Sequence, residues 1–329
     1  MVADWQGGWG GTAHCLLDLL LDSYPGRPVL TFPCAEAEPA SLAGSGAGLA
    51  GAVLTLASLV RASLVTPLSL ARAWYPLPGQ CITTPSLLAL PRPVSHYCSS
   101  AVLALAWDTA SLAWRGRGGV GPGLGDMAAC LTAAGRCLAV LAAELPLQGG
   151  PAALERDLVG GTVPLLPGCP APAPATPYTA AVTVRGLQPA TLYRQRSARF
   201  KDCSNPGEYL ASCVAQHSPG CRPALPALLT RPALTTPPFP DIFSPNVDCN
   251  GWTAQDGAIR PAGVGVGLCG VFTSWETSQH RAGASLASLN TAAAKLVLGR
   301  LHRLGESGVE TEEWTEARET LLQLADCYQ

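Results

Sequence analysis

Charged residues are scarce in this chain of 329 residues, and their scarcity restricts the partners that it can have. Only 13% of the residues are charged, and 21 Lys and Arg against 23 Asp and Glu give a net charge of -2. The basic residues are scattered, so the sequence predicts neither a nucleic-acid partner nor a polybasic patch for anionic lipid. Because 48% of the residues are hydrophobic, the chain can bury a core in one large domain or two ordinary ones.

Paired metal-ligating motifs and nucleophilic motifs are missing as well. The 13 cysteines are dispersed from Cys15 to Cys327 without a C-x-x-C pair, which indicates neither a zinc site nor a disulfide framework and favours a reduced compartment. We expect most of them to be small buried hydrophobic residues. The five histidines stand apart from one another, and no G-x-S-x-G motif of a hydrolase is present. The sequence therefore predicts no metal site and no catalytic residues.

The sequence also shows no basic segment leading into an apolar core near its first residue, so no signal peptide is predicted. One uncharged stretch, 39–60, is long enough to cross a bilayer. It consists mostly of Gly, Ala and Ser, whose transfer into lipid gains little free energy. We therefore expect a buried helix over 44–64, with small residues that allow close packing against a neighbour.

A cluster of glycines directly before an amphipathic run is the feature that points to a site. The candidate phosphate-binding residues are Gly7, Gly8, Gly10, Gly11 and Thr12, with Thr12 as the expected helix cap. Glycines let backbone amides approach an anion, and a helix N-terminus adds unpaired N–H groups and the positive end of its dipole. Two interpretations stay open: a loop that cradles phosphate, or a tight turn that packs a helix against a sheet.

The order of elements in the first half is typical of an α/β unit of the nucleotide-binding type. After the first helix, a short β-rich run over 27–33 predicts a buried parallel strand. A stretch over 96–112 that is apolar nearly all round predicts a central helix. Another helix is expected over 126–137, and the residues up to 147 are either its continuation or a strand.

A shift in composition divides the chain. Pro, Gly and Ala dominate 146–177, which predicts a linker between a nucleotide-type domain over 1–145 and an α+β domain over 178–329. In the latter, strands are expected over 178–187 and 263–274, a loop over 230–251, and helices over 207–217, 285–304 and 310–327.

Several segments together resemble a known family. The glycine loop, its helix and the turn SYPGRPVL resemble a degraded copy of the phosphate unit of the tubulin and FtsZ superfamily, in which GGGTGSG precedes a helix and a YP-x-R turn. Four more segments resemble one branch of it, the Misato family: SLVTPLSL (63–70), HYCSSAVLALAWDT (96–109), PPFPDIFSP (237–245) and LADCYQ (324–329). The resemblance implies a tubulin/FtsZ-like α/β fold, with a truncated parallel sheet flanked by helices and a C-terminal α+β portion.

Two departures from the superfamily pattern limit what the resemblance implies. The chain opens at the glycine loop, so we expect a C-terminal part without the first strands, in which the strand near Val29 and the first helix lose sheet neighbours and expose apolar surface. The acidic N-x-D loop is missing near Glu144, and Trp9 adds bulk to the glycine loop. GTP is therefore not favoured as a cofactor, and no enzymatic activity is expected.

The resemblance implies a non-catalytic protein that regulates mitochondrial distribution, morphology and fusion. It would act in the cytoplasm and at the cytosolic face of the mitochondrial outer membrane, through peripheral contact and protein partners such as tubulin or the cytosolic chaperonin. The alternative is a GTP-binding tubulin-like protein that acts in microtubule or spindle assembly.

Overall fold

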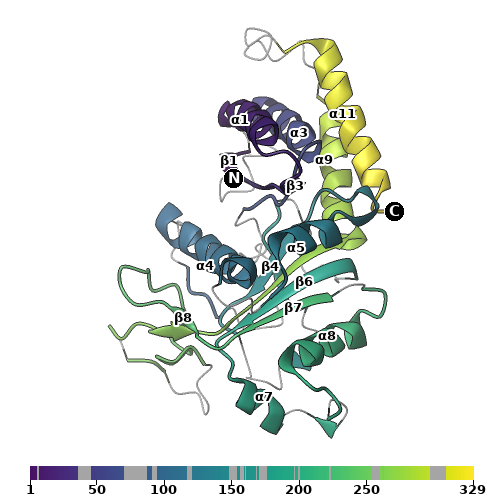
Figure 1. The fold of residues 1–329 in the computed structure, drawn as a ribbon. Coiled ribbons are helices and arrows are strands. Elements are labelled where there is room, and N and C mark those ends of the chain that lie inside the picture. Colours follow the sequence, from purple (N-terminus) through teal and green to yellow (C-terminus); the bar gives the residue numbers. More distant parts are fainter. Residues whose placement is uncertain are drawn as a thin grey trace.

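The computed structural model describes residues 1–5, 7–35, 46–69, 87–90, 95–116, 121–147, 154–155, 159, 161–167, 169, 176–195, 197–198, 201–221, 224–252, 259–261, 263–296 and 309–329. It is a mixed α/β structure in which helices cover strands on both sides (Figure 1), as the sequence predicts at this coarser level. The helices are α1 (Trp9–Ser23), α3 (Gly46–Val60), α4 (His96–Arg115), α5 (Leu124–Leu131), α7 (Pro189–Gln195), α8 (Pro206–His217), α9 (Ala284–Ala294) and α11 (Thr311–Asp326). The strands are β1 (Val2–Asp4), β2 (Leu30–Cys34), β3 (Leu64–Val65), β4 (Val140–Glu144), β5 (Val163–Pro164), β6 (Pro177–Arg185), β7 (Ala224–Leu229), β8 (Ala233–Leu234), β9 (Leu268–Cys269) and β10 (Val271–Ser278).

A strand precedes the glycine loop, which corrects the expectation that the chain opens at that loop. β1 runs parallel to β2, with Val2 opposite Phe32 and Asp4 opposite Cys34. On its other side β2 pairs in parallel with β3. β2 thus lies in the middle of a three-stranded parallel sheet and is buried, so the expectation that it loses its sheet neighbours was wrong.

The larger sheet has five strands in the order β5-β4-β10-β6-β7. β10 is antiparallel to β4 and β6, whereas β6 and β7 are parallel. An isolated parallel bridge from Val65, at the end of β3, to Leu138, two residues before β4, connects this sheet to the three-stranded one. The expected division of the chain at 146–177 stays a prediction; β4 before it and β6, β7 and β10 after it share this sheet.

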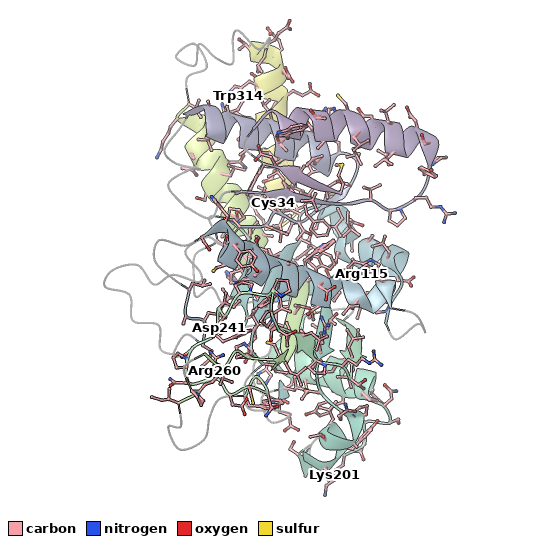
Figure 2. The ribbon with its side chains drawn as sticks, turned by 90° about the vertical axis from the view of Figure 1, so that its left-hand side faces the viewer. Cys34, Arg115, Lys201, Asp241, Arg260 and Trp314 are labelled. Carbon is pink, nitrogen blue, oxygen red and sulfur yellow. The ribbon has the colours of Figure 1, made fainter. Side chains whose placement is uncertain are left out.

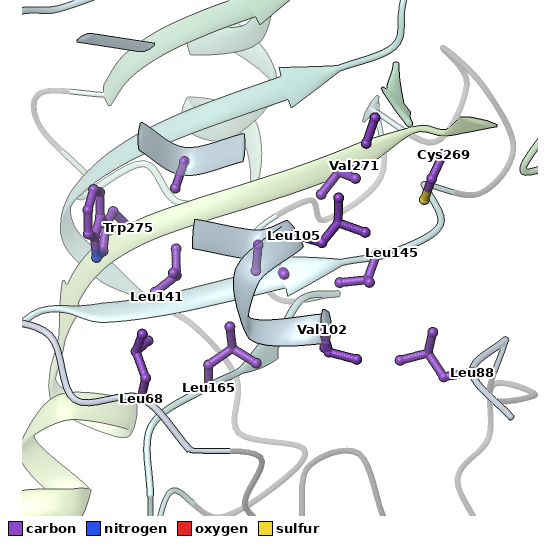
Figure 3. Packing of buried hydrophobic residues seen from close by; sticks show 14 of the residues in the cluster. Leu68, Leu88, Val102, Leu105, Leu141, Leu145, Leu165, Cys269, Val271 and Trp275 are labelled. Carbon is purple, nitrogen blue, oxygen red and sulfur yellow. The ribbon is translucent and has the colours of Figure 1, made fainter. Parts of the chain in front are cut away.

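Successive side chains of the central strands β6 and β10 point to opposite faces of the sheet, and each face has its own hydrophobic core. Val271 and Trp275 of β10 face α4 and α5, where they pack with Val102, Leu105 and Leu141 (Figure 3). Phe272 and the even-numbered residues of β6 face the other side, against α8. Trp275 stacks on Phe32 and on Trp114, with ring centroids 5.7 and 5.2 Å apart. Through its contact with Phe32 of β2, this indole packs the five-stranded sheet against the three-stranded sheet.

A third core lies between α1, α3, α9 and α11, around Leu17, Leu56 and Leu321. α3 ends at Val60, before the predicted end, and residues 39–45 lie outside the described residues. Its mostly buried alanines and leucines support the prediction of a buried helix. None of the helices in the described part of the chain is long and apolar enough to span a membrane.

Other expected elements are confirmed or shifted. The segment after 137 is a strand, β4, and not a continued helix. α5 ends at Leu131, before the predicted end, and the positive φ of 58° at Ala134 and 77° at Gly135 prevents the helix from resuming. The strand expected over 263–274 is β10 and begins at Val271. β7 was not predicted, since Pro226 cannot donate to a ladder, and a place at the edge of the sheet accommodates it.

Candidate functional site

The glycine loop joins the carboxyl end of β1 to the N-terminus of α1, at the same edge as the carboxyl end of β2. This is the topological position in which phosphate loops lie in α/β proteins. The resemblance in sequence thus extends to the order of strand, loop and helix. The contacts within the loop decide what it can hold.

Trp5 anchors the loop from inside. Its indole is buried, and Nε1 donates to the carbonyl of Ala52 in α3 at 3.0 Å. The backbone N–H of Trp5 donates to the carbonyl of Cys34 at 3.0 Å. These two bonds fix the loop to α3 and to β2, so its shape is set by packing.

The Asp4 carboxylate lies against Gly7. A Cβ built on Gly7 would overlap Asp4 Oδ2, which shows how closely the carboxylate approaches this backbone. A phosphate group held at Gly7 would therefore have to lie beside this carboxylate. Asp4 and Trp5 were missed as site residues from the sequence, although both come directly before the glycines.

Gly10 is required by helix packing. A Cβ built on Gly10 would overlap Oγ1 of Thr55 in α3, whereas nothing lies within 4 Å of one built on Gly8 or Gly11. The absent side chain lets α1 and α3 approach closely, as small residues do at helix crossings. Gly10 thus has a packing role, although the predicted turn packs a helix against a sheet and this contact is between two helices, α1 and α3.

The five candidate residues differ in their surroundings. Gly7 and Gly8 lie in the loop, Gly10 faces α3, and Gly11 and Thr12 are exposed on the opposite side of α1. The prediction that Thr12 caps the helix was wrong: α1 begins at Trp9, its N-cap is Gly8, and no side chain caps it. The Trp9 side chain is 71% exposed, and with Leu16 and Leu19 it forms the apolar surface expected on the first helix.

A pair of alanine substitutions separates the roles of two neighbouring glycines. In Gly10→Ala the overlap with Thr55 costs about 1–3 kcal/mol, which exceeds the gain of about 0.5–1 kcal/mol in helix propensity. In Gly11→Ala only the gain applies, so this variant should be more stable than the wild type. Denaturant unfolding measures both. Equal effects, or no recovery of Gly10→Ala by an added Thr55→Ala substitution, would refute the packing role.

Cysteines and histidines form no metal centre in the described part of the chain, where no three His, Cys, Asp or Glu side chains gather at a common point. Half of the twelve described cysteines are buried, fewer than the majority that the sequence predicts: Cys98, Cys130, Cys169, Cys213, Cys221 and Cys269. Burial raises the thiol pKa from the ordinary 9.0 to about 12 for Cys213, Cys221 and Cys269. These thiols stay protonated and unreactive at neutral pH.

The raised thiol pKa values predict a loss of stability in alkali. An unfolded thiol ionises near pH 9, but the folded protein binds these protons up to about pH 12. Their contribution to stability is therefore complete below pH 9, decreases above it, and is lost as the pH rises through the folded pKa. We expect the free energy of unfolding to fall between about pH 9 and about pH 12. A Cys213→Ala/Cys221→Ala/Cys269→Ala variant should show a shallower fall, and an identical slope would contradict this assignment.

Comparison with known proteins places the chain beside one group of relatives. It is 28% identical to "Protein misato homolog 1" of Danio rerio over 350 residues, which cover 100% of this chain and 58% of the relative. It is 27% identical to the Bos taurus protein of the same name, with 100% and 59% covered. "Protein misato" of Drosophila melanogaster is 28% identical over 250 residues, with 70% and 42% covered.

The chain spans 58–60% of the length of the vertebrate relatives it matches. No protein-family model matches it. The resemblance that the short motifs indicated is confirmed by these alignments: the chain is similar to Misato proteins over all of its residues.

Proposed function

We propose that this chain is a non-catalytic Misato-like protein that regulates mitochondrial distribution, morphology and fusion. The similarity to Misato proteins along the whole chain carries the proposal. The family resemblance supplies the mitochondrial role, which we extend to this chain as a whole. We further propose a tubulin/FtsZ-like fold, supported by the parallel β1-β2-β3 sheet with the glycine loop at its carboxyl edge.

The absence of catalysis and of a bound nucleotide is proposed from the loop's contacts. The Asp4 carboxylate lies against Gly7, and Thr55 of α3 lies against Gly10. The N–H groups of Gly10 and Thr12 donate to the carbonyls of Gly7 and Gly8 at 3.2 and 3.4 Å, so these two amides are already bonded within the loop and the first turn of α1. We therefore propose that the glycine loop has kept the backbone shape of a phosphate loop but now serves to pack α1 against its neighbours.

The proposed place of action is the cytoplasm and the cytosolic face of the mitochondrial outer membrane. Contact with the membrane would be peripheral, and the partners would be proteins, with tubulin and the cytosolic chaperonin as those that the resemblance implies. Nucleic acid is not proposed as a partner.

A second candidate function is a GTP-binding tubulin-like protein in microtubule or spindle assembly. The order β1, glycine loop, α1 beside a parallel β2 favours it, since this order is that of a phosphate-binding unit. The Asp4 carboxylate beside Gly7 argues against this second candidate, because it lies where a phosphate group would bind. Binding of GTP separates the two candidates.

Depletion followed by re-expression tests the mitochondrial role. The endogenous protein is depleted from cells that express it, the mitochondrial network is imaged, and a depletion-resistant copy of this chain is then supplied. We expect a fragmented or clustered network that the chain restores, with the stable Gly11→Ala variant restoring it equally. A network that does not change on depletion, while spindles fail, would overturn the proposal in favour of the second candidate.

A further inference from the structure

The three-stranded sheet ends at β1, whose outer edge pairs with no strand in the described part of the chain. The carbonyl of Met1 accepts from β2 at 2.8 Å, and the N–H of Trp5 donates to β2 at 3.0 Å. Because successive peptide groups along a strand point to opposite sides, the N–H and C=O of Val2 point to the outer edge. β1 also lacks the lysine, proline or bulge that protects an exposed edge from pairing.

The helix layer over this sheet ends on the same side. α1 joins β1 to β2 and α3 joins β2 to β3, so the two helices stand in the order of the strands. Gly10 faces α3 through its contact with Thr55. Leu19 follows Gly10 by nine positions, about two and a half turns, so it lies on the opposite side of α1. Trp9 and Leu16 lie within about a quarter turn of Leu19.

Exposed apolar side chains are concentrated where the two layers end. Of the eleven large apolar side chains that are exposed among the described residues, five lie within 2–24: Val2, Trp9, Leu16, Leu19 and Tyr24. In Figure 1, α1 and β1 lie to the left of α3 and β3, and Figure 2 views the molecule from that left-hand side, with α1 crossing its upper part in front of α11. We call the outer edge of β1 and the outer side of α1 the open boundary. It lacks both a strand and a helix to cover it.

The charge of the open boundary is of one sign. Asp18 and Asp22 are exposed on α1, and residues 1–26 contain no lysine or arginine. A second copy of the chain at this surface would bring like charges together, which disfavours self-association. A segment with basic side chains is attracted instead.

The Misato relatives are longer than this chain. The match covers 58–60% of the length of the vertebrate proteins, and the remaining 40–42% lies outside it. We infer that the open boundary binds a strand and a helix from that remaining part of a Misato protein. The added strand would bond to the peptide groups of Val2, and the added helix would cover Leu16 and Leu19 and place basic side chains near Asp18. The inference rests on the similarity to Misato proteins and not on the proposed mitochondrial role.

Co-expression tests the inference. The wild-type chain is co-expressed with an affinity-tagged polypeptide that comprises the part of the Danio rerio relative outside the match. We expect the two to co-purify, with a complex that weakens as salt increases. Leu16→Glu/Leu19→Glu places two charges at the boundary and should weaken binding about a hundredfold. Leu234→Glu/Leu322→Glu replaces two leucines of similar exposure outside the boundary and is the matched control, expected to bind like the wild type.

Val2→Pro tests the added strand separately from the added helix. Proline removes the outward N–H of Val2 but no bond between β1 and β2, so binding should weaken about five-fold while the fold is kept. Circular dichroism of all variants checks that they are folded.

Four results would overturn the inference: no co-purification of the wild type, undiminished binding by either boundary variant, an equal loss in the control variant, or a wild-type dimer in analytical ultracentrifugation that the boundary substitutions dissociate. Any of these combined with a restored mitochondrial network on re-expression would remove only the docking surface and leave the proposed function standing.

Discussion

Replacing Arg281 with alanine is expected to lower the free energy of unfolding by about 3–5 kcal/mol. Arg281 lies in the short π-helix Gln279–Gly283 that follows β10, and its side chain is only 1% exposed. It donates to Glu276 Oε1 at 3.1 Å, to Thr162 Oγ1 at 3.0 Å, and to the carbonyls of Thr162 and Val159 at 3.0 and 3.2 Å. One side chain therefore ties β10 to the 159–162 segment.

The cost arises from what the substitution leaves behind. The Glu276 side chain is completely buried, and without Arg281 its remaining contacts are the hydroxyls of Ser274 and Ser278. A buried carboxylate without its counter-charge is strongly unfavourable, and two carbonyls also lose their donor. Replacing both partners, as in Glu276→Leu/Arg281→Met, removes the unpaired charge and should recover part of the loss.

An exposed ion pair provides the control for Arg281. Arg61 in the turn after α3 binds Glu316 of α11 at 2.8 Å, with both side chains about half exposed. Solvent screens such a pair, so Arg61→Ala should change stability by at most about 1 kcal/mol. Urea unfolding of the three variants measures the difference. If Arg281→Ala cost no more than Arg61→Ala, the account of the buried pair would be wrong.

Replacing Tyr328 with alanine is the second large perturbation, expected to cost about 3–5 kcal/mol. The ring is buried, and its hydroxyl accepts from the N–H of Leu138 at 3.0 Å and donates to the carbonyl of the same residue. Tyr178 donates to the carbonyl of Tyr328 at 3.0 Å, and Arg136 donates to that of Cys327 at 2.9 Å. The residues after α11 are thereby fastened to the start of β4.

Tyr328→Phe separates the ring from its hydroxyl. The phenylalanine keeps the apolar contacts and leaves the buried peptide groups of Leu138 without a partner, which should cost about 1–3 kcal/mol. Tyr24 is largely exposed at the end of α1, so Tyr24→Phe and Tyr24→Ala are the matched controls. Thermal unfolding should rank alanine below phenylalanine at 328 and show little change at 24. The same loss at both positions would contradict the fastening role of Tyr328.

The local sequence pattern was sufficient to predict the helices and strands in which apolar residues recur with a clear period. The helices α4, α8 and α11 and the strands β2 and β6 lie where the apolar spacing predicts them. β1 was missed because three residues are too short to show alternation. The start of β10 was placed too early because the glycines over 263–270 resemble a strand that approaches another backbone.

The contacts that decide the role of the glycine loop could not be predicted, because they join segments far apart in the chain. Nothing in the glycines themselves reveals that Thr55 lies against Gly10 or that Trp5 bonds to Ala52. The buried partners of Arg281 come from the 159–162 segment for the same reason. A motif of this kind therefore indicates ancestry, and packing determines whether the chemistry remains.

Isothermal titration of the purified wild-type chain with Mg-GTP is the most direct measurement on the glycine loop. We predict no saturable binding up to about 1 mM nucleotide, because the Asp4 carboxylate lies at Gly7 and the N–H groups of Gly10 and Thr12 are already bonded to the carbonyls of Gly7 and Gly8. Asp4→Asn removes that charge and is measured beside the wild type. Saturable binding of GTP by the wild type would contradict the account and would favour the nucleotide-dependent tubulin-like function.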